Sequence, residues 1–234
     1  MENLDLSIVL PAYNESENLP DVLRGLKKAL NEANIESEII VVDNGSSDST
    51  EQVLKSFKKE INELKTLRIE KNIGFVNGVL KGLETARGPI LGYMVADGQV
   101  KSEVPVIVYQ KLKQDNLEIC RAIRISRDDG FIRYAVSKVY NFLFRLVFHS
   151  PFKDVNSGPK IFTRKFYETI KPSSKDDFLD SEILLKAKDN NFLVGEVGIA
   201  SQARHKGRSS VSIYLFPLKF LRNMICWFLF KKIR

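Results

Sequence analysis

Short apolar runs alternate with longer amphipathic stretches over the first hundred residues of the chain. Residues 6–10 form an apolar run broken only by Ser7, which is typical of a strand buried on both faces of a sheet. From Leu19 to Leu26, leucine and valine recur at helical spacing before the next apolar run. The alternation predicts strands at 6–10, 38–42, 64–69 and 90–94, with helices between them. This β-α-β-α-β-α-β order predicts a parallel sheet with right-handed crossovers.

The second half of the chain has a less regular pattern. Its apolar spacing predicts helices at 104–114, 131–148 and 181–190, and strands at 118–123, 160–162 and 192–197. Apolar positions of the helix at 131–148 lie on one face, with Arg133, Lys138 and Arg145 interleaved. This helix either packs on the core with a solvated basic side or lies in a membrane interface.

The tail at 213–234 is rich in leucine, phenylalanine and isoleucine but is interrupted by Pro217, Lys219 and Arg222. These interruptions argue against a membrane span. Trp227 and the basic end of the chain suit a helix lying on an anionic surface. The alternative is a helix docked on its own domain or on a partner.

Acidic residues follow three of the predicted parallel strands: Glu15, Asp43 and Asp97. The carboxyl ends of parallel strands share one edge of the sheet, where open α/β proteins bind ligands. Asp97 and Gln99 together offer two oxygen ligands suited to Mg²⁺ or Mn²⁺. The competing interpretation of Asp97 is a turn-initiating residue before Gly98.

Composition narrows the choice of ligand. The chain has 234 residues, and 36 basic against 29 acidic side chains give a net charge of +7. This balance suits a phosphate-rich ligand or an anionic membrane surface, and the lack of a DNA- or RNA-binding motif argues against nucleic acid. The two cysteines, Cys120 and Cys226, lie far apart, which favours a reduced, cytoplasmic compartment.

With these motifs in place, the chain resembles family 2 glycosyltransferases of the GT-A fold, and among them the polyprenol- and dolichol-phosphate sugar synthases. The likeness covers roughly residues 6–211. It predicts an α/β, Rossmann-like, mostly parallel central sheet with flanking helices as a domain at 1–211, and an amphipathic, membrane-interfacial tail at 212–234. The motifs are LPAYNE at 10–15, VVDNGSSD at 41–48, NIG at 72–74 with Gly78, ADGQ at 96–99, DVNSG at 154–158, DSE at 180–182, and Arg204 with Gly207 and Ser209.

The resemblance implies a role for each motif. Asp97 and Gln99 would hold a divalent ion, Mg²⁺ or Mn²⁺, that bridges the donor diphosphate, and Arg204 would help to clamp that diphosphate. Asp43 would accept a hydrogen bond from the base. The implied nucleotide-binding set is Pro11, Ala12, Tyr13, Glu15, Asp43, Asn72, Ala96 and Asp97.

Two departures from the family pattern stand out. Val95 replaces the first acid of the usual Asp-x-Asp triplet, and Ser210 stands where the loop usually has a lysine, a charge that Arg208 would supply. With one carboxylate at the metal position, a catalytically silent sugar-nucleotide-binding or membrane scaffold protein is an alternative to an enzyme.

The chemistry of the acceptor decides whether the reaction needs a general base. A lipid phosphate is already an anionic nucleophile, whereas a glycan hydroxyl needs a general base, for which Asp180 or Glu182 is a candidate. Arg124, Arg127 and Arg133 favour a phosphate delivered from a membrane. We therefore expect inverting transfer from a nucleotide-diphosphate sugar to a polyprenyl phosphate, by an enzyme peripherally attached to the cytoplasmic face of a membrane. A family 2 enzyme acting on a glycan hydroxyl is the alternative.

Overall fold

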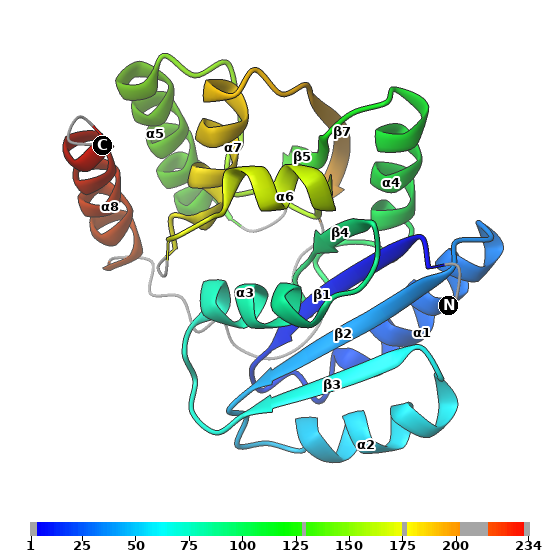
Figure 1. Cartoon of the computed structure of the whole chain (residues 1–234). Coiled ribbons are helices and arrows are strands. Elements are labelled where there is room, and N and C mark those ends of the chain that lie inside the picture. The colour runs from blue at the N-terminus through cyan, green and yellow to red at the C-terminus, as the bar shows by residue number, and fades with distance from the viewer. Residues whose placement is uncertain (1–3, 128–129, 175–176, 202–214, 232–234) are drawn as a thin grey trace.

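The computed structural model describes residues 4–127, 130–174, 177–201 and 215–231. Seven strands form one sheet in the order β3-β2-β1-β4-β6-β5-β7 (Figure 1). Strand β6 runs antiparallel to its neighbours β4 and β5, and every other neighbouring pair is parallel. The predicted α/β class with a mostly parallel sheet is therefore confirmed. The strands are β1 (Leu6–Ala12), β2 (Ser37–Asn44), β3 (Leu64–Ile69), β4 (Ile90–Tyr93), β5 (Ile119–Arg127), β6 (Lys160–Thr163) and β7 (Val194–Ser201).

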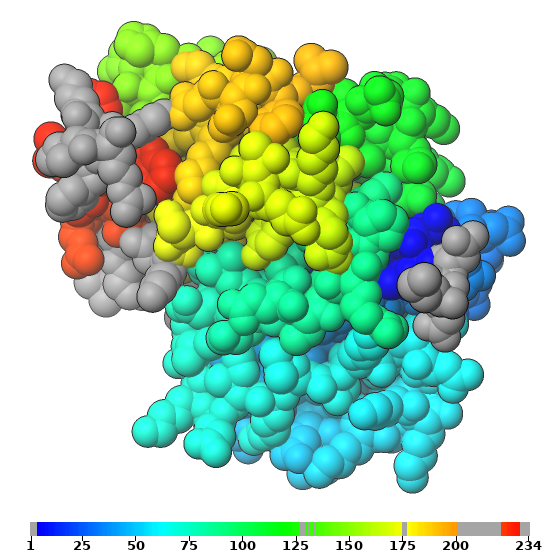
Figure 2. All heavy atoms as spheres, in the orientation of Figure 1, coloured from blue at the N-terminus to red at the C-terminus, as the bar shows by residue number. Residues whose placement is uncertain are grey.

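Helices cover both faces of the sheet, which explains the near-continuous apolar runs of the central strands. Alternate β1 residues point to opposite faces: Ile8 packs in the core under α1, α2 and α4, and Val9 packs in the core under α3, α6 and α7. Figure 2 shows α3, α6 and α7 lying over much of one face. The helices are α1 (Leu19–Glu32), α2 (Thr50–Glu60), α3 (Phe75–Thr85), α4 (Val104–Gln114), α5 (Phe131–Phe148), α6 (Arg164–Ile170), α7 (Leu179–Asp189) and α8 (Leu215–Lys231).

Two local features differ from the sequence expectation. Strand β1 continues through Pro11 to Ala12, because the pairing of β1 with β4 ends at Val9 and Pro11 interrupts no ladder on that side. Helix α6 was missed, although its cap is visible in the sequence. Thr163 caps the helix by accepting a hydrogen bond from the Phe166 N–H at 3.1 Å.

A third core lies between α5, α7 and α8. It contains Phe144 of α5, Leu184 of α7 and Met224 of α8. Helix α8 is therefore the predicted C-terminal helical segment, and it is docked on the domain through α5 (Figure 1). The boundary predicted between residues 211 and 212 lies outside the described residues.

A buried carboxylate joins the amino-terminal ends of the strands. Glu38 is 2% exposed and accepts hydrogen bonds from the Ser7 hydroxyl at 2.6 Å, from the Arg87 N–H and from Lys65. Burial raises the pKa of Glu38, but these hydrogen bonds outweigh burial, so the pKa lies below its ordinary value of 4.5. The ionised form of Glu38 therefore stabilises the fold.

We expect Glu38→Gln to lower stability near neutral pH by about 2 kcal/mol, because the network loses its negative charge and one of its two acceptor oxygens. The folded-state pKa is depressed, so the contribution of Glu38 is present above the unfolded-state pKa and lost as pH falls through the folded-state value. The deficit should shrink towards pH 3 in urea unfolding followed by circular dichroism. Glu60→Gln, at an exposed ion pair with Arg24, should have little effect at either pH. A deficit independent of pH would contradict this account.

Candidate active site

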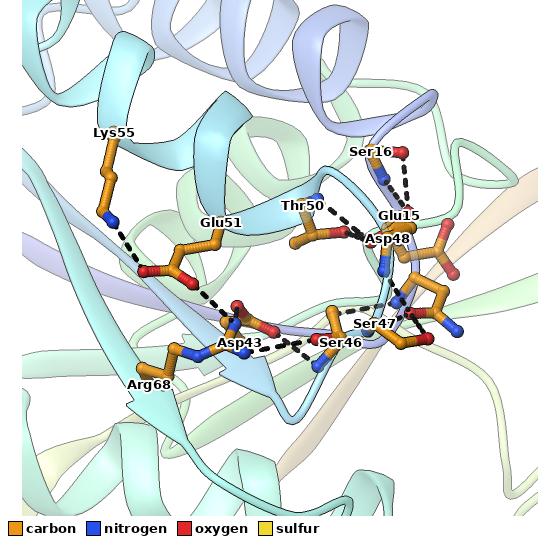
Figure 3. Close-up of polar contacts among 11 residues, drawn as sticks. Glu15, Ser16, Asp43, Ser46, Ser47, Asp48, Thr50, Glu51, Lys55 and Arg68 are labelled. Carbon is orange, nitrogen blue, oxygen red and sulfur yellow. Dashed lines mark hydrogen bonds and ion pairs between the residues drawn. The ribbon is translucent and has the colours of Figure 1, made fainter.

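The loops after β1 and β2 are joined by short polar side chains (Figure 3). The Asn14 carboxamide oxygen accepts a hydrogen bond from the Ser47 N–H at 2.8 Å. Asp48 accepts hydrogen bonds from the Ser16 hydroxyl at 2.6 Å and from the Thr50 hydroxyl at 2.6 Å. Because neither loop is regular structure, these bonds set where the ends of the two strands lie relative to each other.

Asp43 ends up at the centre of this region. It is 2% exposed at the end of β2, and its carboxylate accepts a hydrogen bond from the Ser46 N–H at 3.0 Å and another from the Arg68 guanidinium (Figure 3). Glu15 is also buried here, with its N–H donating to the Thr50 hydroxyl at 3.0 Å. The sequence suggested no partner for Asp43, since Arg68 lies on a separate strand.

The other predicted nucleotide-binding residues lie around the same edge of the sheet. Pro11 and Ala12 are buried at the end of β1, and Tyr13 beyond them is exposed. Asn72 is held beside β2, where its side-chain oxygen accepts a hydrogen bond from the Asn44 carboxamide at 3.2 Å. Gly45 allows this approach: its φ is +74°, and an added Cβ would lie 2.7 Å from the Asn72 nitrogen.

The loop after β4 carries the predicted metal ligands. Asp97 and Gln99 are both half-buried, and Asp97 Oδ1 accepts a hydrogen bond from the Gln99 N–H at 3.1 Å. Asp97 thus starts a turn, with Gly98 at φ +75°. The turn and the metal interpretation are compatible, because a carboxylate has further lone pairs to offer.

Asp97 and Gln99 form a small donor set for a divalent ion. Within the described residues, no three acidic, histidine or cysteine side chains lie close enough to hold a metal. One carboxylate and one amide oxygen are hard ligands that fit Mg²⁺ or Mn²⁺, which commonly take the rest of their shell from substrate phosphates and water. The fit therefore depends on Asp97, since the Val95 side chain offers no oxygen.

A cleft of about 120 Å³ lies beside this loop and is lined by Gln99, Tyr93, Arg124 and Asp180, among others. Asp180 Oδ1 accepts hydrogen bonds from the Tyr93 hydroxyl at 2.5 Å and from the Lys160 ammonium at 2.5 Å. Burial raises the pKa of Tyr93 well above its ordinary value, and the Asp180 charge adds to this effect. Tyr93 therefore stays a neutral hydrogen-bond donor.

Lys160 is fully buried at the start of β6. Burial lowers its pKa, and the attraction of Asp180 opposes that shift. Neither Lys160 nor Tyr93 was among the predicted site residues. The signal for Lys160 was a lone lysine opening an otherwise apolar strand.

The predicted acceptor-phosphate arginines are not all placed alike. Arg124 lines the cleft and makes a bidentate pair with Asp154, through Nε at 2.9 Å and Nη2 at 2.5 Å. Arg127 is the last residue of β5, and Arg133 lies in the first turn of α5. Both therefore lie near the carboxyl end of β5, but the structure does not describe their side chains.

One further predicted catalytic residue, Glu182, lies outside this constellation. Glu182 is fully buried and does not line the cleft; it accepts hydrogen bonds from the Ser173 N–H at 2.8 Å and the Ser174 N–H at 2.7 Å, and pairs with Lys186. Its contacts join α7 to the loop before it. Arg204 lies outside the described residues.

Comparison with solved structures defines the fold class. Glucosyl-3-phosphoglycerate synthase from Mycobacterium tuberculosis, solved with Mn²⁺, UDP-glucose and phosphoglyceric acid, superposes with a TM-score of 0.76 at 15% identity. The match covers 97% of this chain and 80% of that one. This similarity confirms the predicted GT-A fold.

Sequence comparison gives the family. The model of "Glycosyl transferase family 2" matches residues 7–171, so the chain belongs to that family. A dolichyl-phosphate beta-glucosyltransferase of Dictyostelium discoideum is 28% identical over 85% of this chain. An undecaprenyl-phosphate 4-deoxy-4-formamido-L-arabinose transferase of Aeromonas hydrophila is 30% identical over 60% of it. The chain spans 67% of the first relative and 44% of the second.

The Lys160–Asp180 pair should contribute strongly to stability. We expect Lys160→Met to cost about 3 kcal/mol in urea unfolding, because it leaves a partly buried carboxylate without its cation. The double variant Lys160→Met/Asp180→Asn should recover at least about 1 kcal/mol of that loss. Lys138→Met, at an exposed position on α5, should change stability by less than about 0.5 kcal/mol. Strict additivity of the two substitutions would contradict the pairing.

Proposed function

We propose that this chain is an inverting glycosyltransferase that moves a sugar from a nucleotide-diphosphate sugar to a polyprenyl phosphate. The observation that carries the proposal is the placement of Asp43 and Asp97 at one edge of the parallel sheet, next to the cleft lined by Arg124 and Asp180. The two relatives named above are transferases whose names specify dolichyl and undecaprenyl phosphates.

On the donor side, the nucleotide occupies the region between the ends of β1 and β2. Asp43 accepts a hydrogen bond from the base while Arg68 holds its carboxylate in place. Asp97 and Gln99 would hold the divalent ion, which would supply positive charge to offset the charge that grows on the departing diphosphate. Arg204, which lies outside the described residues, would add to this charge compensation.

On the acceptor side, the contacts of the two candidate bases favour a phosphate nucleophile. Glu182 is enclosed by Ser173, Ser174 and Lys186 and does not line this cleft. Asp180 faces the cleft, but it is engaged by Lys160 and Tyr93. A lipid phosphate needs no proton removed, so an acceptor of this kind requires no further base.

We also propose that α5 and α8 attach the protein to a membrane surface. Within the described residues, no helix is long and apolar enough to cross a bilayer. Phe142 on α5 is 65% exposed and Ile225 on α8 is 51% exposed, on two helices that contact each other. The exposed apolar residues of the pair are Ile132, Val139, Phe142 and Leu146 on α5, and Leu221, Ile225, Phe228 and Leu229 on α8.

The opposite side of α8 faces the protein. Met224 is buried in the core with α5 and α7, and the Trp227 ring lies 5.5 Å from that of Phe178. Trp227, which the sequence assigns to an anionic surface, is half-buried, with its ring against Phe178. The helix combines the docked and the interfacial alternatives, because its two sides differ.

The compartment remains a prediction. Both cysteines are free thiols, and burial raises the pKa of Cys120 to about 11, which keeps it unreactive. We propose the cytoplasmic face of the membrane on this basis together with the sequence argument.

A transfer assay tests the proposed reaction. Purified protein with radiolabelled nucleotide sugars, Mg²⁺ or Mn²⁺ and polyprenyl phosphate in detergent should form a lipid-linked sugar. Asp97→Asn should reduce turnover by at least about 100-fold, since the donor diphosphate loses its main cation site, and Val95→Asp should keep or raise metal affinity. Asp115→Asn, which is exposed at the end of α4, is the control. Transfer to glycan hydroxyls instead, or wild-type turnover by Asp97→Asn, would contradict the proposal, and binding without transfer would indicate a silent protein.

Liposome flotation tests the membrane surface. Replacing Leu221, Ile225 and Phe228 by serine should reduce binding to anionic vesicles at least tenfold, because each large side chain buried in the interface contributes about 1.5–3 kcal/mol. Salt should weaken binding of the wild type without abolishing it. Point variants avoid a problem of truncating the chain after Val211: truncation would remove Met224 and expose the core residues of α5 and α7 that it covers. Ile107→Ser, an exposed apolar position on α4, should float like the wild type. Equal flotation of the triple variant would disprove the attachment through α8.

A further inference from the structure

Two polar side chains in the loop before β6 have no role in the account so far. Ser157 is 3% exposed, and its Oγ has no hydrogen-bond partner among the described residues. In the same part of the chain, the Asn156 Oδ1 is likewise buried without a partner. Buried polar groups are almost always paired, because leaving one unpaired costs stability. Two neighbouring exceptions therefore call for a ligand.

Both residues line the cleft that also contains Asp180. The hydrogen bonds that Asp180 receives, from Lys160 and Tyr93, fall on Oδ1, and no described residue donates to Oδ2. The cleft thus gathers two acceptor oxygens, from Asn156 and Asp180, and the Ser157 hydroxyl, which can donate or accept.

The cation that lines the same cleft is already engaged. Arg124 directs Nε and Nη2 at the carboxylate of Asp154. A phosphate with no proton to donate would leave Asn156 Oδ1 and Asp180 Oδ2 unsatisfied, although the Ser157 hydroxyl could donate to it. A polyol donates hydrogen bonds through its hydroxyls, so it satisfies these oxygens.

The buried Lys160 ammonium holds Ser157 and Asp180 in place relative to each other. Lys160 Nζ donates to the Ser157 carbonyl oxygen at 2.5 Å as well as to Asp180. The Ser157 N–H donates to the Asp154 carbonyl oxygen at 3.1 Å. The loop and the start of α7 are therefore held together before any ligand arrives, which favours discrimination between ligands of similar shape.

We propose that Asn156, Ser157 and Asp180 form the subsite for the hydroxyls of the transferred sugar, and that Asn156 and Ser157 help to set which sugar the protein accepts. This inference rests on the proposed function. Gln99, one of the two residues proposed to hold the metal and the donor diphosphate, lines the same cleft.

Isothermal titration calorimetry with matched ligand pairs tests the subsite. UDP-glucose is compared with UDP, and GDP-mannose with GDP, on the full chain. The wild type should bind one nucleotide sugar more tightly than its nucleotide, and Ser157→Ala and Asn156→Ala should each reduce that ratio at least fivefold. Affinity for the nucleotide alone should stay within twofold, which also reports that the variants are folded.

Ser150→Ala is a matched control. Ser150 is also buried, but its Oγ accepts a hydrogen bond from the Phe152 N–H at 3.3 Å and lies outside the cleft. This variant should keep the wild-type ratio and melt at a lower temperature. Ligand-free Ser157→Ala should melt no lower than the wild type, because it removes an unpaired buried hydroxyl.

Three results would overturn the subsite. The two variants could keep the wild-type ratio, or they could lose nucleotide affinity to the same extent as nucleotide-sugar affinity. They could also raise the KM for farnesyl phosphate while the ratio stays intact, which would assign the cleft to the acceptor phosphate. Failure of the proposed function would give a different result, because the wild type would then bind none of the four ligands. That result would also rule out the sugar subsite.

Discussion

The buried contact between Lys160 and Asp180 is the interaction on which the arrangement of the cleft depends. An ammonium with no solvent exposure is costly to bury, and the cost is offset only where a carboxylate and further acceptors surround it. Here the partners come from three parts of the chain: Asp180 from α7, the Ser157 carbonyl from the loop before β6, and Tyr93, through Asp180, from β4. Because the buried Lys160 ammonium needs all of these partners, it holds the elements that line the cleft in place.

Carboxylates at the two ends of the sheet serve different purposes. Glu38, at the amino-terminal ends, is enclosed by Lys65, Ser7 and a backbone N–H, and it stabilises the fold. Asp43 and Asp97 lie at the carboxyl-terminal ends, where the loops leave room for a ligand. Burial alone does not distinguish these two settings, because Glu38 and Asp43 are equally buried. The end of the parallel strands at which each carboxylate lies distinguishes them.

The C-terminal helix shows how one segment can both complete the core and present a surface. Met224 packs against α5 and α7, while Ile225, the next residue, is half exposed. Successive helical residues point about 100° apart, so a helix of mixed apolar residues can place some inward and others outward. That docking brings α5 and α8 into contact, so the exposed apolar residues lie on two adjacent helices.

The sequence by itself determined the order of the first four strands and the intervening helices, because apolar periodicity is a local property. It also placed Glu15, Asp43 and Asp97 at the ends of those strands, and Asp97 at a turn. Asp180 and Glu182 were equivalent candidates in the sequence. Being two residues apart on a helix, they point to different sides, and packing decided that Asp180 faces the cleft while Glu182 is enclosed.

Only the tertiary structure decided which residues meet across long separations. The antiparallel insertion of β6 between β4 and β5 brings Lys160 beside Tyr93, 67 positions earlier by residue number, and no local pattern encodes that pairing. The same insertion sets Asn156 and Ser157 in the wall of the cleft, where their lack of partners becomes visible. Whether a polar side chain is satisfied depends on every neighbour that folding brings to it, so this property appears only once the chain is folded.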